Sequence, residues 1–129
     1  MEYSERNDFN PKFRTRTRQF AINLCKLFNK PQQGESTRVV VKQIIRSGTS
    51  VASNFYAATR ARSIAEYYSK ICIVVEECDE TFFWLDLLKD AELIKEEKIL
   101  ELYKETEELL KVFSTTKKNL KTKLKPPKK

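Results

Sequence analysis

Hydrophobic residues recur every three or four positions along four segments of the chain. In the third segment the steps alternate between four and three without a break, at Ile64, Tyr68, Ile71, Val75, Cys78, Phe82 and Leu85. Such spacing places the residues on one face of an α-helix and is typical of helices that pack in bundles. Comparable faces are found at residues 13–28, 41–55 and 99–113.

The pattern predicts four helices, at about residues 11–29, 35–61, 64–90 and 95–119. Asn10 and Pro11 suit a helix start, as the cap and the first helical residue. Ser63 and Glu66 form a capping box before the third helix. We therefore expect an all-α, antiparallel up-down-up-down four-helix bundle. Residues 1–10 are expected to be a flexible N-terminus and residues 120–129 a disordered, Lys-rich tail.

The segment from Arg46 to Asn54 is small and polar in the middle of the second helix. Gly48 and Ala52 lie one turn apart on its apolar face, which predicts a notch where another helix approaches closely. The nearby hydroxyl and amide groups need hydrogen-bond partners if they are buried, and a carbonyl of the preceding turn is an obvious one. We favour a close helix crossing over a polar contact with a subunit or with nucleic acid.

Charge is distributed unevenly along the chain. Residues 1–62 have a balance of +8, residues 63–116 of −8 and residues 117–129 of +7. The basic and acidic halves either pair within one bundle or form complementary patches between subunits, and both interpretations stay open.

Basic side chains on the first two helices and in the tail predict binding to the phosphates of RNA or DNA. For the tail, a merely solubilising role is an equal alternative. The candidate residues are Arg14, Arg16, Arg18, Lys42, Arg46, Arg60, Arg62, Lys117, Lys118, Lys121, Lys123 and Lys125.

No catalytic or metal-binding arrangement stands out. The chain has no His and no CxxC pair, which argues against a Ser–His nucleophile and a zinc site. Cys25, Cys72 and Cys78 lie in apolar stripes and are interpreted as small buried side chains in a reducing compartment. We expect a cytoplasmic protein that is not an enzyme, with no metal, no cofactor and no membrane segment.

The third helix carries one group of acidic residues and one group of aromatic residues, and for both we favour a structural role over a functional one. Glu76-Glu77 and Asp79-Glu80 are read as a solvated helix flank rather than as paired catalytic carboxylates. Trp84, beside Phe82 and Phe83, is read as core rather than as a platform for stacked bases.

The chain resembles a known family in two runs, RSGTSVASN at residues 46–54 and ETFFWLDLL at residues 80–88, with Ala58 and Ala61-Arg62-Ser63 between them. The family is the bacterial four-helix-bundle family, also called the rRNA intervening-sequence protein family. It is similar in fold to the accessory variability proteins of diversity-generating retroelements. The likeness covers about residues 12–115. The family usually has acidic residues shortly after the Asn, where Tyr56 and Ala57 stand here.

The resemblance implies a cytoplasmic homopentameric ring without catalytic residues. The retroelement relatives bind nucleic acid and a reverse transcriptase, so the resemblance also implies partners of these two kinds. It suggests an assembly or packing motif comprising Arg46, Gly48, Ser50, Ala52, Asn54 and Trp84. The expected function is that of a non-enzymatic oligomeric protein that associates with RNA or DNA, as accessory to a reverse transcriptase or a ribonucleoprotein. The alternative is a protein-interaction scaffold with no nucleic-acid role.

Overall fold

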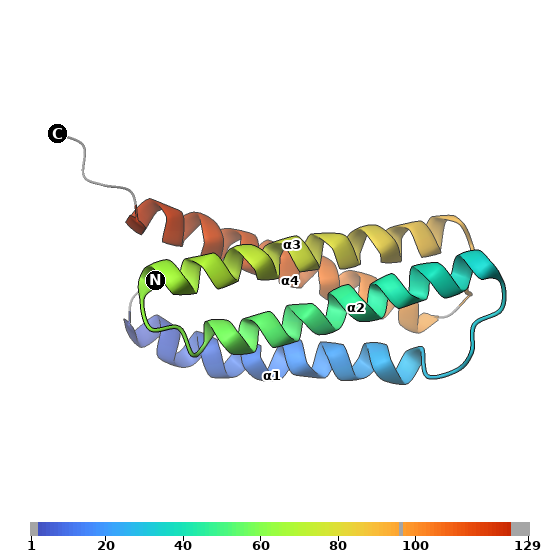
Figure 1. Cartoon of the computed structure of the whole chain (residues 1–129), viewed down its shortest axis with the longest axis horizontal. Coiled ribbons are helices and arrows are strands. Elements are labelled where there is room, and N and C mark those ends of the chain that lie inside the picture. The colour runs from blue at the N-terminus through green and yellow to red at the C-terminus, as the bar shows by residue number, and fades with distance from the viewer. Residues whose placement is uncertain (1–2, 96, 125–129) are drawn as a thin grey trace.

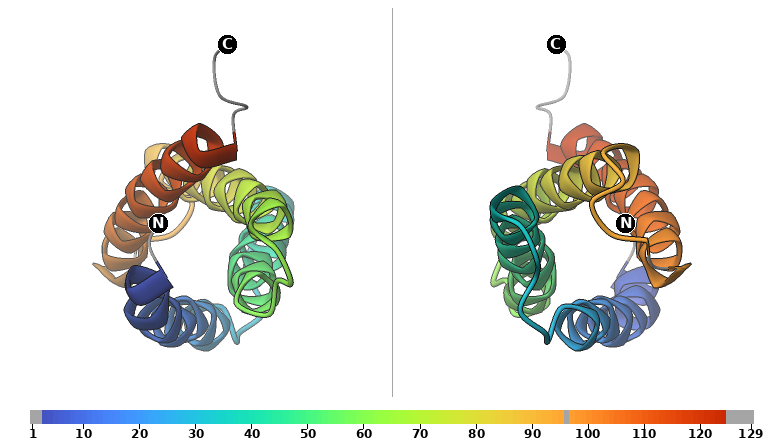
Figure 2. Two further views of the ribbon diagram at one scale, coloured as in Figure 1. Left: turned by 90° about the vertical axis from the view of Figure 1, so that its left-hand side faces the viewer. Right: turned by 90° about the vertical axis from the view of Figure 1, so that its right-hand side faces the viewer.

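The computed structural model describes residues 3–95 and 97–124, with side chains from residue 8 onward. These residues form four helices, α1 (Tyr3–Leu27), α2 (Glu35–Ala58), α3 (Ile64–Asp90) and α4 (Glu97–Leu124). Consecutive helices run antiparallel beside one another (Figure 1), and the view along the bundle axis shows them arranged around a common centre (Figure 2). The predicted all-α four-helix bundle is confirmed.

The apolar faces of the four helices meet in one core. On α3 every buried residue lies three or four positions from the next, from Tyr67 to Leu88. Aromatic rings join three helices near one end, where Phe113 of α4 lies 5.1 Å from Phe55 of α2 and 5.6 Å from Phe13 of α1, between ring centroids. Full burial of each such side chain contributes about 1.5–3 kcal/mol.

Helix α3 has the predicted bounds, and Ser63 caps it. The Ser63 hydroxyl accepts a hydrogen bond from the backbone N–H of Glu66 at 3.1 Å. Helix α2 begins at Glu35 as expected and ends at Ala58, before the predicted residue 61. It ends there because the N–H groups of Arg60 and Ala61 bond to carbonyls three residues back, which tightens the chain into a corner.

The start of α1 differs from the prediction, since the helix begins at Tyr3 and contains Pro11 in its interior. Phe9 stacks on Phe13 with ring centroids 4.5 Å apart. Asn10 does not act as the predicted cap, because it lies inside the helix, and its side-chain oxygen accepts a hydrogen bond from the Tyr67 hydroxyl at 2.8 Å. These contacts hold the segment on the bundle despite the backbone hydrogen bond that a proline removes. Residues 1–2 lie outside the described residues.

The end of α4 also differs, because the helix continues to Leu124 where a disordered tail was expected from residue 120. Leu120 is fully buried and extends the periodic face of Phe113 and Thr116 by one more turn. Lys121 and Lys123 are therefore helical. Lys125 and the residues after it lie outside the described residues, as does residue 96.

The predicted notch at Gly48 is confirmed at the crossing of α1 and α2. A Cβ atom built on Gly48 would overlap Cδ1 of Leu24 and lie 3.5 Å from Cε2 of Phe20. The neighbouring hydroxyls bond to carbonyls of the preceding turn, as expected: Ser47 donates to Gln43 at 2.8 Å and Thr49 donates to Ile45 at 2.7 Å. The small polar segment thus permits close packing without unpaired buried hydroxyls.

The prediction of three buried cysteines is correct for Cys78 alone. Cys78 is buried, Cys72 is half-buried and Cys25 is exposed, and all three are free thiols. Burial raises the pKa of the Cys78 thiol to about 12. Cys25 follows Leu24 on α1, and one position along a helix is enough to leave the buried face. Among the described residues, no helix has the length and hydrophobicity that crossing a membrane requires.

Candidate nucleic-acid interface

The up-down topology brings basic segments that are distant in sequence to one end of the bundle. The corner between α2 and α3 and the last turns of α4 both lie there (Figure 1), and the left view of Figure 2 looks onto this end. The side chains are half-buried in the case of Lys117 and exposed in the other cases. We call this surface the basic end and define it as Arg60, Arg62, Lys117, Lys118, Lys121 and Lys123.

Few ion pairs within the chain offset the basic end. Arg62 lies 3.4 Å from Glu66 in a largely exposed pair, and such pairs contribute about 0–1 kcal/mol. Arg60 and the four lysines of the basic end form no ion pair with any side chain that the structure describes. The surface therefore carries a net positive charge available to a polyanion.

Two of the predicted binding residues instead hold the bundle together. The guanidinium of Arg16 on α1 lies 2.6 Å from the Glu105 carboxylate and 3.3 Å from that of Glu108, both on α4. The hydrogen bond to Glu105 raises the pKa of Arg16. At these positions the basic and acidic halves of the sequence pair within one chain, which was one of the two interpretations left open.

Arg46 makes the corresponding contact between α2 and α3, with Glu80 and with Glu77 at 3.5 Å. Its pKa is raised, mainly by the hydrogen bond to Glu80. Burial raises the pKa of Glu77, whose side chain is 18% exposed, because desolvation penalises the charged form. The predicted solvated flank is thus correct for Glu76 and Asp79, which are exposed. Glu77 and Glu80 face Arg46.

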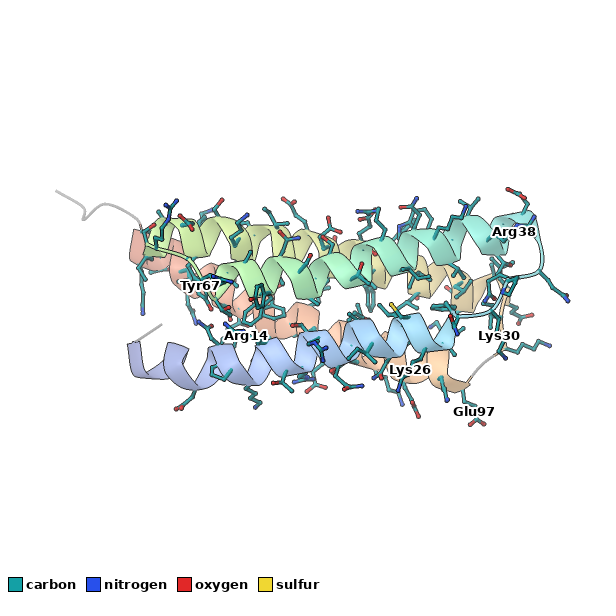
Figure 3. The ribbon with its side chains drawn as sticks, turned by 60° about the horizontal axis from the view of Figure 1, so that its bottom comes forward. Arg14, Lys26, Lys30, Arg38, Tyr67 and Glu97 are labelled. Carbon is teal, nitrogen blue, oxygen red and sulfur yellow. The ribbon has the colours of Figure 1, made fainter. Side chains whose placement is uncertain are left out.

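The other predicted residues lie elsewhere on the surface. Arg18 and Lys42 are exposed, stand apart from the basic end and form no ion pair with a described side chain. Arg14 lies against the end of α2, where its guanidinium donates a hydrogen bond to the Thr59 hydroxyl at 2.6 Å. Figure 3 shows Arg14 on α1, toward the same end of the bundle as Tyr67 of α3. The eleven predicted residues that the structure describes do not form one surface.

Most of the remaining residues of the assembly or packing motif make contacts within the chain. Asn54 donates to the Ser50 carbonyl at 2.9 Å and to its hydroxyl at 2.8 Å. Ala52 is half-buried. Trp84 is half-buried at the edge of the core, and its indole N–H donates to Glu80 at 3.5 Å. Phe83 beside it is exposed, so the core interpretation holds for Trp84 and not for its neighbour.

A groove of about 540 Å³ lies between α1 and α4, which pack less closely than the consecutive helices. Phe20 and Leu102 provide apolar lining, and the rim mixes both charges, with Lys26, Lys30 and Lys98 beside Glu101 and Glu105. Figure 3 shows Lys26 and Lys30 near the end of the bundle where α4 begins at Glu97. No cluster of metal-binding side chains occurs within residues 3–95 and 97–124. The mixed rim offers a polyanion no clear attraction.

Comparisons with known proteins agree with this fold. A crystal structure from Bacteroides thetaiotaomicron, of a protein of unknown function from the S23 ribosomal protein family, is 29% identical with a TM-score of 0.73. The match covers 84% of this chain and 97% of that chain. No curated protein matches the chain. Residues 11–115 match the family described as 23S rRNA-intervening sequence protein, so the chain belongs to the 23S rRNA-intervening sequence protein family.

Proposed function

We propose that the protein is a non-enzymatic RNA-binding protein that holds the phosphate backbone on its basic end. The observation that supports this is the gathering of six basic side chains from two distant segments, of which Arg62 alone has a carboxylate partner among the described residues. Lys and Arg side chains bind phosphates without reading sequence. The names of the family and of its structural relative refer to rRNA and to a ribosomal protein, which favours RNA over DNA.

A structural explanation accounts for part of this charge. Lysines near the C-terminus of a helix interact favourably with its dipole, and Lys121 and Lys123 lie in the last turn of α4. The effect falls off within that turn. It therefore leaves Lys117, Lys118 and Arg60 unexplained, whereas binding to a polyanion accounts for all of them.

The proposal is tested by the salt dependence of RNA affinity. Fluorescence anisotropy with a mixed-sequence single-stranded RNA would give the dissociation constant at a series of salt concentrations. Six phosphate contacts to a single strand predict a slope of about −4 in log affinity against log salt. Electrostatic binding to phosphates is strongest at low salt, so the absence of binding at about 50 mM salt would overturn the proposal.

We further propose that the protein is a homo-oligomer, as its resemblance to the bacterial four-helix-bundle family implies a pentamer. Phe83 is 56% exposed and Leu87 is 40% exposed, one turn apart on α3. Large apolar side chains that are exposed together mark interaction sites. A second candidate function, a protein-interaction scaffold with no RNA role, is favoured by the same pair, because a partner protein would cover it equally well.

Light scattering tests the assembly. The wild-type mass is expected near five times the chain mass of 15.2 kDa, and Phe83→Glu is expected to give a smaller species because it places a charge in the interface. Leu124→Glu, an equivalent change at an exposed apolar position in the last turn of α4, serves as the control. A monomeric wild type, or an assembly that Phe83→Glu leaves intact, contradicts this part of the proposal.

A further inference from the structure

Two arginines gather around one exposed tyrosine where α1 meets the end of α2. The guanidinium carbon of Arg14 lies 5.2 Å from the centroid of the Tyr56 ring, and that of Arg60 lies 5.7 Å from it. Tyr56 is 48% exposed. The three side chains come from two helices and the corner that follows α2, so the tertiary fold is what assembles them. We call them the Arg–Tyr–Arg cluster.

Hydrogen bonds hold the cluster in place before any ligand arrives. Arg14 donates to the Thr59 hydroxyl at 2.6 Å, and that hydroxyl in turn donates to the backbone carbonyl of Tyr56 at 2.7 Å. Arg60 donates to the Tyr56 hydroxyl at 3.1 Å. Each guanidinium carries five N–H donors, so most of them stay available for a ligand. Side chains that are already ordered lose less entropy on binding.

The cluster lacks the negative charge that the other interhelical arginines have. Arg16 and Arg46 each lie between two carboxylates, whereas neither Arg14 nor Arg60 forms an ion pair with a described side chain. Two guanidinium groups beside the same ring repel each other, and an anion between or beside them would remove that repulsion. The arrangement is therefore suited to a ligand that brings negative charge.

The ligand chemistry follows from the two kinds of group present. The planar fork of a guanidinium matches the oxygens of a phosphate, and the part of the Tyr56 ring that the two guanidinium groups leave exposed can stack on a nucleobase. One nucleotide of a single strand offers both groups together, while a duplex keeps its base faces stacked inside the helix. Arg60 also belongs to the basic end, so the cluster is continuous with the surface that holds the backbone.

We propose that the Arg–Tyr–Arg cluster binds one nucleotide of single-stranded RNA, with its phosphate on Arg14 and Arg60 and its base on Tyr56. The inference rests on the proposed RNA-binding function and adds a preference for unpaired over paired RNA. It also separates two roles: the lysines of the basic end supply affinity for the backbone alone, and Tyr56 supplies contact with a base.

The test compares variants by fluorescence anisotropy with a labelled single-stranded RNA. Tyr56→Leu is expected to weaken binding about 5- to 100-fold, the effect of losing one stacked base, and to leave the salt slope unchanged. Tyr56→Phe keeps the ring and is expected to bind nearly as the wild type. Arg14→Gln with Arg60→Gln is expected to weaken binding and to lower the slope by about 1.4, since each lost phosphate contact changes it by about 0.7.

Controls separate the cluster from general charge and from other phosphates. Lys26→Gln with Lys30→Gln removes the same charge from the opposite end of the bundle and is expected to change affinity little. An RNA of the same length with abasic sites should bind Tyr56→Leu and the wild type equally. Inorganic phosphate and phosphatidylserine vesicles, at constant ionic strength, should compete poorly, and strong competition by either would overturn the assignment to a nucleotide.

The outcomes distinguish this inference from the function on which it rests. If the wild type binds RNA and the cluster variants behave like the Lys26 and Lys30 control, the nucleotide site is wrong and the RNA-binding proposal stands. Equal affinity of the wild type for single-stranded and duplex RNA would likewise overturn the site. If the wild type binds no RNA at low salt, both are overturned.

Discussion

Replacing Gly48 by alanine is expected to destabilise the protein by about 1–3 kcal/mol, the usual effect of overpacking a core. Alanine is the better helix former by about 1 kcal/mol, so propensity alone predicts the opposite sign. The added methyl group would overlap Cδ1 of Leu24, which is fully buried at the crossing of α1 and α2. Because Leu24 is closely packed, either its side chain must leave its rotamer or α1 must shift, and both disturb the core.

Chemical denaturation of a double-mutant cycle measures this effect. Leu24→Ala alone should cost about 2–5 kcal/mol because it leaves a cavity. In that background Gly48→Ala should be neutral or stabilising, since the added methyl group then has room. A gain in stability from Gly48→Ala in the wild-type background would contradict the close crossing, as would additive effects of the two substitutions.

Neutralising the four lysines of the basic end is expected to produce the largest change in RNA affinity. Replacing Lys117, Lys118, Lys121 and Lys123 by glutamine removes four phosphate contacts. At about 0.1 M salt this should weaken binding roughly 10²- to 10³-fold and lower the salt slope by about 3. Helix α4 should remain folded, because three of these side chains are exposed and glutamine is a good helix former.

A matched variant at the other end of the bundle shows whether position or total charge matters. Lys26, Lys30, Lys95 and Lys98 lie around the end where α1 finishes and α4 begins. Replacing these four by glutamine changes the net charge equally and is expected to weaken binding only slightly. Equal losses in the two variants would show that RNA responds to net charge rather than to the basic end.

Much of the fold was predictable because local signals agreed with packing. The capping box at Ser63 and the unbroken spacing up to Leu85 gave α3 its bounds. Gly48 indicated a close crossing, because a glycine destabilises a helix interior and close packing is a common reason for its presence there. The local signals could not show which residues pack against Gly48, because Leu24 and Phe20 come from another helix.

The errors at the two ends of the chain have a common physical cause. Pro11 is a strong local signal for a helix start, yet contacts of Phe9 with rings from two other helices support a longer α1. The run of lysines after residue 116 suggested disorder, yet the buried side chain of Leu120 extends α4. In both cases tertiary burial outweighed local propensity.

The candidate site was only partly predictable for the same reason. Basic residues were identifiable from composition, but the neighbouring carboxylates of Arg16 and Arg46 lie 31 or more positions away in the chain. Tyr56 was not among the residues predicted to bind. The signal in the sequence was its spacing of four from Arg60, which puts the two on one helix face, but the contact with Arg14 depends on how α1 packs.

Lysine footprinting by mass spectrometry tests the central claim most directly. The protein would be acetylated with and without a single-stranded RNA at low salt, and the loss of reactivity of each lysine would be compared. We expect protection of Lys117, Lys118, Lys121 and Lys123 and little change at Lys26, Lys30, Lys95 and Lys98. Protection of both groups alike, or of the second group alone, would contradict an RNA-binding surface at the basic end.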